Sequence, residues 1–372
     1  MKIVAVDVWR AEVPLRGQFK NAHGVKTAQT SVVVRLRTDA GLEGAGNVDP
    51  DPGYSESTPE QVIAALTGRI APALVGHPAV QVRGALARMD RAAPRAWDAH
   101  AAVEMALLDL NGQALGVPVH RLLGGALKER IELNGWIGVG SEAEAVADAR
   151  RFAAMGYRSA KIKVGAGVER DRDRVAAVRA ALPDLAIRVD ANEGFDVPTA
   201  IALGRALAPY GVTLLEQPVA RGDIAGLAAV RRAIDIPVMA DEAIVGPETL
   251  LQVIREEAAD IVKVKVMKQG GLLRCLQAID LAAAAGVRCV IGHGFGLTLN
   301  TLAELHVAAV SDNVLDACEC VGPVKMGADV VRAPLVMPEG ATPVPQGPGL
   351  GAALDPVALE KYATLVSGRG RG

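Results

Sequence analysis

The sequence predicts an α/β protein with a TIM-like (β/α)7β barrel and an N-terminal α+β capping domain that the C-terminal tail completes. Between residues 163 and 319, charged residues recur at the ends of short β-branched runs, and a segment with helical periodicity follows each run. Strands that alternate with helices form a parallel sheet. Polar groups at the carboxyl ends of about eight such strands indicate the mouth of a barrel.

The spacing of these charged residues is that of one strand plus one helix. Subtraction of their numbers gives intervals between 24 and 28 residues for the series Lys163, Asp190, Glu216, Asp241, Lys265, His293 and Glu319. Because the carboxyl ends of parallel strands meet at the same edge of a sheet, all of these side chains are expected to converge on one site.

The capping domain is predicted over residues 1–125. Its first 55 residues alternate like antiparallel strands, with a hairpin turn at 38–41, and Gly44 and Gly46 indicate a close backbone approach or a bulge. From Thr58 the pattern becomes helical, with a Thr N-cap and a proline at the first helical position. A strand meander followed by helices is typical of an α+β unit.

The catalytic barrel is predicted over residues 126–333, and its first strand lies in RIELNGWIG at 130–138. Residues 334–372 are rich in proline and glycine, with one closing helix. We expect this C-terminal segment to return to the capping domain.

Composition excludes several classes of function. The net charge of −2 and the 3% aromatic content provide neither a basic footprint nor a stacking platform for nucleic acid. The alternating N-terminus is not a signal peptide, and no window approaches 18 uninterrupted apolar residues, so no membrane span is predicted. The four cysteines lack the spacing of zinc or redox sites and are expected to be reduced thiols in a cytoplasmic protein.

Three acidic residues end three consecutive predicted strands: Asp190 in RVDAN, Glu216 in LLEQP and Asp241 in MADEA. Carboxylates brought together on one arc of the mouth repel one another unless a cation lies between them, and hard oxygen ligands suit Mg²⁺. The sequence therefore predicts a Mg²⁺ site. The alternative is that the three carboxylates cap the helices that follow their strands.

Other polar residues adjoin these carboxylates. Glu242 follows Asp241 directly, so on a strand it is expected to point the other way. Asn192 and Gln217 follow Asp190 and Glu216 closely and are expected at the rim of the site.

Two pairs of lysines, Lys161 with Lys163 and Lys263 with Lys265, end the second and sixth predicted strands. These strands lie opposite each other in an eight-stranded barrel, so a substrate between Lys163 and Lys265 meets an amine on each side. Residues two apart project from the same strand face, and a neighbouring ammonium disfavours the charged form. We therefore expect lowered pKa values that suit a general base. Alternatively, a single lysine at such a position is a surface charge.

These groups together predict a reaction class. A divalent cation on a substrate carboxylate stabilises the second negative charge that forms when a lysine removes the proton from the adjacent carbon. The product of that step is an enediolate. Return of a proton by Lys265 on the opposite face would give racemisation or epimerisation, and departure of a leaving group would instead make the enzyme a lyase.

The remaining candidate residues each have more than one possible role. Glu319 is expected to bind a substrate oxygen or to pair with the lysines, and Lys268 is either a loop charge or a partner of Asp241 or Glu216. His293, in GHGFG, is an acid, a substrate-orienting group or a satisfied polar residue of a Gly-rich loop. Two loops, around His23 and around 51–54 with Tyr54, are long enough to be lids over the substrate, or else are surface loops.

The motifs AKIKVGAG, RVDANEGF, LLEQPV, MADEA, VKVMKQGGL and ECVGP resemble those of the enolase superfamily, in its mandelate racemase and muconate lactonizing (muconate cycloisomerase) group. The resemblance covers essentially the whole chain. It implies Mg²⁺ on Asp190, Glu216 and Asp241, a K-x-K motif at Lys161 and Lys163, and a second base at Lys265. It further implies that loops of the capping domain, with His23 and Tyr54, close over the barrel, and that the protein is a homo-oligomer, a dimer or an octamer.

The chain departs from the pattern of this family at two places. His293 resembles a histidine of mandelate racemase, but Lys265 replaces the partner aspartate on strand six. Residues 316–319 read Asp-Ala-Cys-Glu instead of the Asp-x-Asp ending that dipeptide epimerases resemble. The sequence thus predicts a cycloisomerase or a racemase/epimerase acting on a small carboxylate. The alternatives are a dehydratase of a hydroxy acid or hydroxyproline-type substrate and a non-catalytic binding protein.

Overall fold

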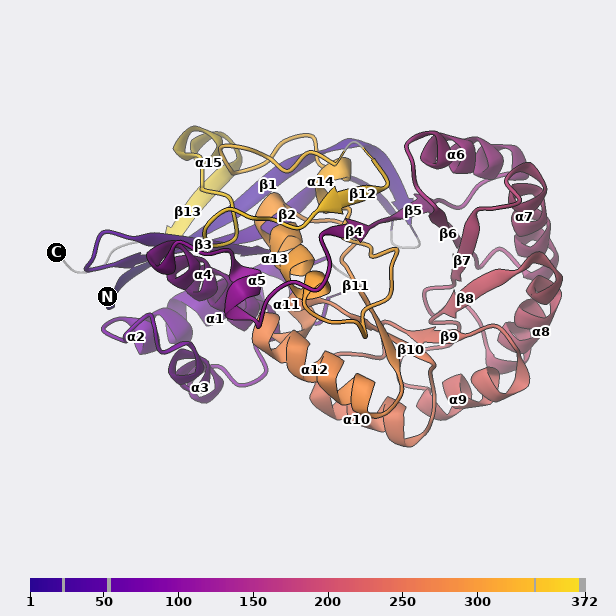
Figure 1. Ribbon diagram of the computed structural model, residues 1–372, viewed down its shortest axis with the longest axis horizontal. Helices are drawn as coiled ribbons and strands as arrows, with labels where there is room; N and C mark the ends of the chain where they lie inside the picture. Colours follow the sequence, from indigo (N-terminus) through magenta and orange to yellow (C-terminus); the bar gives the residue numbers. More distant parts are fainter. Residues whose placement is uncertain (22–23, 52–54, 338, 368–372) are drawn as a thin grey trace.

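The computed structural model describes residues 1–21, 24–51, 55–337 and 339–367. The chain forms two parts that lie side by side (Figure 1): a cap built on an antiparallel sheet, and a curled parallel sheet whose outer face is covered by helices. The described part of the chain both begins and ends at the cap (Figure 1). This arrangement confirms the predicted fold class.

The cap sheet contains four strands in the order β13-β1-β2-β3. Its strands are β1 (Ile3–Asn21), β2 (Gly24–Thr38), β3 (Glu43–Val48) and β13 (Ala363–Ser367). The predicted turn joins β2 to β3, where Thr38 N donates to Leu42 O at 3.1 Å. Since β13 pairs antiparallel with β1, the tail returns to the cap as predicted.

Helices complete the cap. They are α1 (Pro59–Ala65), a π-helical turn η1 (Leu66–Ile70), α2 (Ala71–Leu74), α3 (Val82–Ala92), α4 (Trp97–Leu115) and α5 (Val119–Leu122). Thr58 caps α1 as predicted, through a reciprocal capping box with Gln61. The predicted close backbone approach is confirmed at Gly46, where an added Cβ would lie 2.2 Å from Ala102 O of α4.

The barrel sheet has seven parallel strands in the order β11-β10-β9-β8-β7-β6-β5. They are β5 (Asn134–Ile137), β6 (Ser159–Lys163), β7 (Ala186–Asp190), β8 (Val212–Glu216), β9 (Val238–Ala240), β10 (Ile261–Val264) and β11 (Arg288–Ile291). Between them run α6 (Glu142–Ala154), α7 (Val168–Ala181), α8 (Val197–Leu207) with the 3-10 turn η2 (Ala208–Tyr210), α9 (Ile224–Ala233), α10 (Pro247–Arg255) and α12 (Leu272–Ala284). Four further helices are α11 (Val266–Gln269), α13 (Thr298–Ala309), α14 (Gly322–Lys325) and α15 (Pro356–Tyr362).

The predicted eighth strand is irregular. Val314 and Cys318 form isolated parallel bridges to Cys289 and Leu133, so this segment spans the two edges of the sheet without a continuous ladder. Ala317 has a left-handed backbone with φ of 62°, which interrupts an extended strand at this point. The guanidinium of Arg188 donates to the carbonyl oxygens of residues 316 and 317, at 2.8 and 2.7 Å.

The predicted first strand is split into two elements. β4 (Arg130–Glu132) pairs antiparallel with β12 (Ala341–Pro343) of the tail, and only β5 enters the barrel sheet. Part of the tail therefore contacts the barrel before the chain reaches the cap.

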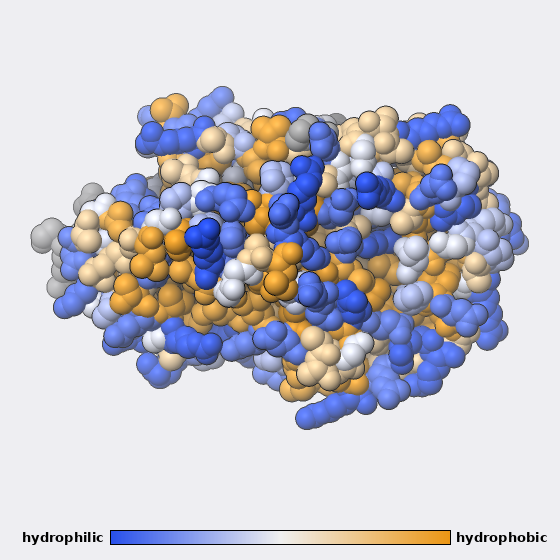
Figure 2. Space-filling view, in the orientation of Figure 1, coloured by the Kyte–Doolittle hydropathy of each residue, from blue (hydrophilic) through white to orange (hydrophobic). Residues whose placement is uncertain are grey.

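Among the described helices, none is both long enough and apolar enough to cross a bilayer. Figure 2 shows hydrophobic and hydrophilic side chains interspersed on one face, with hydrophobic atoms mainly across its middle and hydrophilic atoms frequent at the barrel end.

Candidate active site

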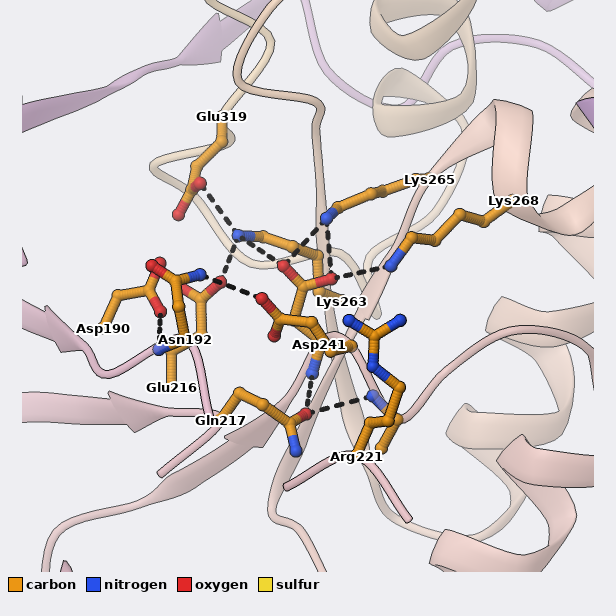
Figure 3. A network of polar contacts seen from close by, with 12 residues as sticks. Asp190, Asn192, Glu216, Gln217, Arg221, Asp241, Lys263, Lys265, Lys268 and Glu319 are labelled. Carbon is orange, nitrogen blue, oxygen red and sulfur yellow. Dashed lines mark hydrogen bonds and ion pairs between the residues drawn. The ribbon is translucent and has the colours of Figure 1, made fainter. Parts of the chain in front are cut away.

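The strand register brings the predicted site residues together. Lys163 pairs with Asp190, and Asp190 pairs with Glu216, so the ends of β6, β7 and β8 are level. Asp241 follows the end of β9 directly. Figure 3 shows Lys263, Lys265 and Lys268, from β10 (Ile261–Val264) and the residues that follow it, pointing toward the carboxylates of this cluster.

Two inner lysines lie among the carboxylates. Lys161 Nζ is 2.9 Å from Asp190 Oδ2 and 2.9 Å from Glu216 Oε2. Lys263 Nζ is 2.6 Å from Glu216 Oε1 and 3.6 Å from Asp241 Oδ2. These two ammonium groups therefore join the three acidic residues into one buried network.

Glu319 completes the inner network. Its Oε2 atom accepts hydrogen bonds from Lys161 at 2.7 Å and from Lys263 at 2.8 Å. The structure thus confirms that Glu319 pairs with lysines, which was one of the two expectations for this residue.

The predicted lowering of lysine pKa values is wrong for the inner pair. Burial disfavours the ammonium of Lys161, but the charges of Asp190, Glu216 and Glu319 outweigh it and raise the pKa of Lys161 well above 10.5. The pKa of Lys263 is raised for the same reason, against burial. Sequence spacing places the second ammonium correctly, but it does not reveal that carboxylates surround each inner lysine.

The outer lysines stand at the cavity wall. Lys163 Nζ donates to Asp190 Oδ2 at 2.6 Å and to Asn192 Oδ1 at 2.5 Å. Lys265 Nζ lies 2.7 Å from Oδ1 and 2.8 Å from Oδ2 of Asp241. They come from β6 and from the end of β10, and both line a cavity of about 200 Å³.

Rim residues hold the carboxylates in position. The side-chain oxygen of Gln217 accepts from the backbone N–H groups of Asp241 and Ala243, at 2.9 and 3.1 Å. Asn192 has a left-handed backbone with φ of 42°, and its N–H donates to Asp190 Oδ1 at 3.0 Å. Both residues therefore lie beside the acidic cluster, as expected.

The expectation that Glu242 points away from the site is wrong. Its Oε1 accepts from Asn192 Nδ2 at 2.9 Å, and the side chain is buried. Strand β9 ends at Ala240, so the alternation of side chains along a strand does not extend to Glu242.

Lys268 and His293 adjoin Lys265. Lys268 lies on α11, is buried, and places Nζ 3.6 Å from Asp241 Oδ1, which confirms the pairing and contradicts the loop charge. Burial, with the charges of nearby lysines, lowers the pKa of His293 well below 6.5, so its imidazole is neutral. Its Nε2 has no hydrogen-bond partner within the described part of the chain, which contradicts the satisfied polar residue.

His23 and Tyr54 lie outside the described residues, so the predicted lids stay predictions. Sequence reasoning missed Trp136 and Lys325, which also line the cavity. Trp136 lies within the predicted first strand, and Lys325 stands six residues after Glu319 in GPVKM. A charged residue shortly after the last predicted strand was the available signal for Lys325.

The carboxylate cluster fits a divalent cation by the chemistry of its donors. Within the described residues no three acidic, histidine or cysteine side chains surround one point, since ammonium groups stand between the carboxylates. Burial and the charge of Asp190 nevertheless raise the pKa of Glu216 to about 8 despite two adjacent lysines. The carboxylates of the cluster therefore still repel one another. Their hard oxygen atoms are suitable donors for a further cation.

Two family models match the chain. Residues 3–124 match the model "Mandelate racemase / muconate lactonizing enzyme, N-terminal domain", and residues 144–358 match "Enolase C-terminal domain-like".

Curated relatives align over nearly the whole chain. N-succinyl-L-Arg/Lys racemase of Bacillus cereus is 30% identical, with 98% of this chain and 99% of the relative covered. Muconate cycloisomerase 1 of Pseudomonas putida is 32% identical, with 94% of each covered. L-Ala-D/L-Glu epimerase of Bacillus subtilis is 31% identical, with 94% of this chain and 96% of the relative covered.

Solved structures show the same similarity. The crystal structure of N-succinyl Arg/Lys racemase from Bacillus cereus superposes with a TM-score of 0.92 at 29% identity, covering 99% of this chain and 100% of the other. Muconate lactonizing enzyme from Pseudomonas fluorescens, complexed with muconolactone, gives 0.92 at 30% identity, covering 98% and 99%.

Proposed function

The chain belongs to the mandelate racemase/muconate lactonizing enzyme group of the enolase superfamily, and from this premise we propose that it is a Mg²⁺-dependent isomerase of a small carboxylate. In this proposal a lysine removes the proton α to the substrate carboxylate, which gives an enediolate. The main observation that supports this proposal is that Lys163 and Lys265 line one cavity. They come from β6 and the end of β10, on either side of the acidic cluster.

The acidic cluster would hold the cation. Asp190, Glu216 and Asp241 are buried, end three neighbouring strands, and offer hard oxygen donors. When bound, Mg²⁺ supplies positive charge against the second negative charge that develops on the substrate carboxylate.

The two outer lysines would exchange the proton. A base needs hydrogen-bond reach to the proton that it removes, and both amino groups border the cavity. An amine on each side of a planar enediolate allows removal on one face and return on the other. The opposed pair therefore favours racemisation or epimerisation, while ring closure after a one-sided proton transfer is the cycloisomerase outcome.

A dehydratase is the second candidate, and His293 favours it. The unpartnered Nε2 of this neutral imidazole borders the same cavity, where it could hydrogen-bond a hydroxyl that leaves. The opposed lysines have no use in a non-catalytic binding protein, so we do not favour that alternative.

The predicted assembly follows from the family resemblance, and the predicted location follows from the composition of the chain. A homo-oligomer, as a dimer or an octamer, and a cytoplasmic location stay predictions, with a small-molecule carboxylate as the partner. Light scattering of the purified protein measures the oligomeric state.

The proposed function is tested by NMR in D₂O. The protein is incubated with Mg²⁺ and a panel of N-acyl amino acids, proline derivatives, sugar acids and muconates, with an EDTA control. Metal-dependent loss of the α-proton signal is expected, and the product distinguishes epimerase, cycloisomerase and dehydratase. Exchange that persists in EDTA, or absence of both exchange and Mg²⁺ binding, contradicts the proposal.

A further inference from the structure

One face of the cap helix α4 contacts the start of the barrel helix α12. Trp97, His100 and Glu104 are three and four residues apart on α4, so their side chains leave the same side of the helix. Each of the three contacts residues 270–274, the stretch in which α12 begins. The cap is therefore joined to the barrel at this stretch.

The carboxyl group of Glu104 accepts hydrogen bonds from the first backbone N–H groups of α12. Its Oε1 accepts from Leu273 N at 3.2 Å, and the N–H of Leu272 donates to the same carboxyl group. The first N–H groups of a helix have no acceptor within that helix, so an acidic side chain beside them is stabilising. Here the acceptor comes from the cap, 169 residues earlier in the chain.

Two glycines leave the space that α4 fills. Gly270 and Gly271 have φ of 83° and 128°, a backbone conformation that favours glycine. A Cβ on Gly270 would lie 2.9 Å from Trp97 Cε3, and a Cβ on Gly271 would overlap Glu104 Oε2. The carboxyl group of Glu104 therefore occupies the position that a side chain of residue 271 would take.

The same stretch closes the turn that carries two lysines of the site. Gly271 N donates to Val266 O at 3.0 Å, and Gln269 N donates to Lys265 O at 3.1 Å. Lys265 directly precedes α11, and Lys268 lies on it. A helix of only four residues is not stable on its own, so contacts from outside decide where its side chains lie.

Arg274 provides a second attachment to the cap. Its Nη2 lies 2.6 and 2.8 Å from the two carboxylate oxygens of Asp90 on α3, and its guanidinium carbon lies 4.6 Å from the centroid of the Trp97 ring. The side chain of Asp90 is 45% exposed, whereas Glu104 is fully buried. Loss of a buried hydrogen-bond partner costs more than loss of an exposed one, so Glu104 is expected to contribute more to this attachment.

Resting on the proposed function, we propose that Glu104 is a positioning residue for Lys265. From the cap it holds the start of α12, and through Gly271 and Val266 it fixes the end of β10 from which the amine reaches the cavity. Glu104 itself does not line that cavity. Lys163 comes from β6, on the other side of the acidic cluster, so loss of Glu104 is expected to affect the two outer lysines unequally.

The variants separate the hydrogen bonds of Glu104 from its charge. E104A removes the acceptor, and E104D withdraws it by one methylene group. E104Q keeps an acceptor oxygen for Leu273 N, and a neutral side chain suits this position because burial raises the pKa of Glu104 to about 7. D109A is the matched control. Asp109 is also buried on α4, but it accepts from Ala45 N at 2.9 Å and from Leu350 N at 2.8 Å, away from α12.

The first measurement is hydrogen exchange of the full-length proteins, followed by mass spectrometry, which needs no substrate. E104A is expected to exchange the amide protons of residues 265–275 about tenfold faster than the wild type, because buried donors lose their acceptor and local opening becomes easier. E104Q and D109A are expected to keep the wild-type rate there. E104D is measured in place of E104A if the latter does not fold. Wild-type exchange over residues 265–275 in the folded variant overturns the proposal.

The second measurement compares the two outer lysines through initial rates of α-proton exchange in D₂O with Mg²⁺. The probes are the separate D and L enantiomers of the N-acyl amino acids and proline derivatives of the panel. The enantiomer whose α-proton faces Lys265 is the one that Lys163→Ala still exchanges. E104A is expected to exchange this enantiomer about ten- to a hundredfold more slowly than the wild type, and the other enantiomer within about threefold. E104Q is expected to behave like the wild type.

Equal slowing of both enantiomers would indicate general damage and would overturn the role of Glu104, while the proposed function stands. Failure of the proposed function gives a different pattern, in which the wild type exchanges no α-proton of any probe. The hydrogen exchange of residues 265–275 then decides by itself whether Glu104 holds the turn that carries Lys265.

Discussion

The Nζ atom of Lys163 lies 2.6 Å from Oδ2 of Asp190, so a proposed base and a proposed metal ligand are in direct contact. The two residues are also register partners on β6 and β7. Variants that remove one of these side chains and keep the other can therefore distinguish the effect on proton transfer from the effect on metal binding.

Replacement of Lys163 by alanine is expected to abolish turnover, because one of the two opposed bases is lost, while Lys265 can still exchange an α-proton that faces it. Loss of a positioned base typically lowers the rate by about 10²–10⁴-fold. The Mg²⁺ affinity should be equal to that of the wild type or slightly higher, because an ammonium that competes for Asp190 is removed. Product formation followed by NMR and a Mg²⁺ titration provide the two readouts. Substantial turnover by this variant would remove Lys163 as a base.

Replacement of Asp190 by asparagine is expected to weaken Mg²⁺ binding by at least about tenfold, since a charged ligand becomes neutral. Asp316→Asn is the matched control, because the side chain of Asp316 is 77% exposed on the surface. Calorimetric Mg²⁺ titrations of both variants make the comparison. An unchanged titration for Asp190→Asn would move the metal site elsewhere.

Replacement of His293 by asparagine distinguishes the two candidate reactions. Isomerisation by Lys163 and Lys265 does not need a neutral imidazole, so α-proton exchange should remain within about tenfold of the wild type. In a dehydratase, exchange should persist while release of the hydroxyl falls by about 10²-fold or more. Both rates can be read from the same NMR time course, and complete loss of exchange would show that His293 takes part in the proton transfer itself.

Replacement of Gly46 by alanine is expected to destabilise the cap. The new Cβ would lie 2.2 Å from Ala102 O and 2.7 Å from Met105 Cβ, so β3 and α4 must separate. Overpacking of this kind costs about 1–3 kcal/mol or more in the free energy of unfolding. Gly68→Ala is the control, because nothing lies within 4 Å of its new Cβ and alanine favours a helix. Urea unfolding should show a loss for the first variant and none for the second.

Local sequence patterns were sufficient for the strands, helices and strand-end charges. The spacing from Lys163 to Glu319 indicates one strand and one helix per repeat. Strands that repeat in this way form a parallel sheet, and such a sheet belongs to few fold classes. Predictions from these local patterns were wrong at two places, because the residues there are not part of a regular strand. Glu242 lies two residues beyond the end of β9, and the left-handed backbone at Ala317 interrupts the predicted eighth strand.

The sequence by itself determined the fold class and the set of charged groups at the barrel mouth, because periodicity and turn chemistry are local properties of the chain. Only the tertiary structure decided which charges meet. The inner lysines have raised pKa values because carboxylates from β8 and residues 314–319 surround them, and Lys325 joins the cavity because two distant aromatic residues hold its ammonium. Such contacts depend on inter-strand register and burial, which link residues far apart along the chain.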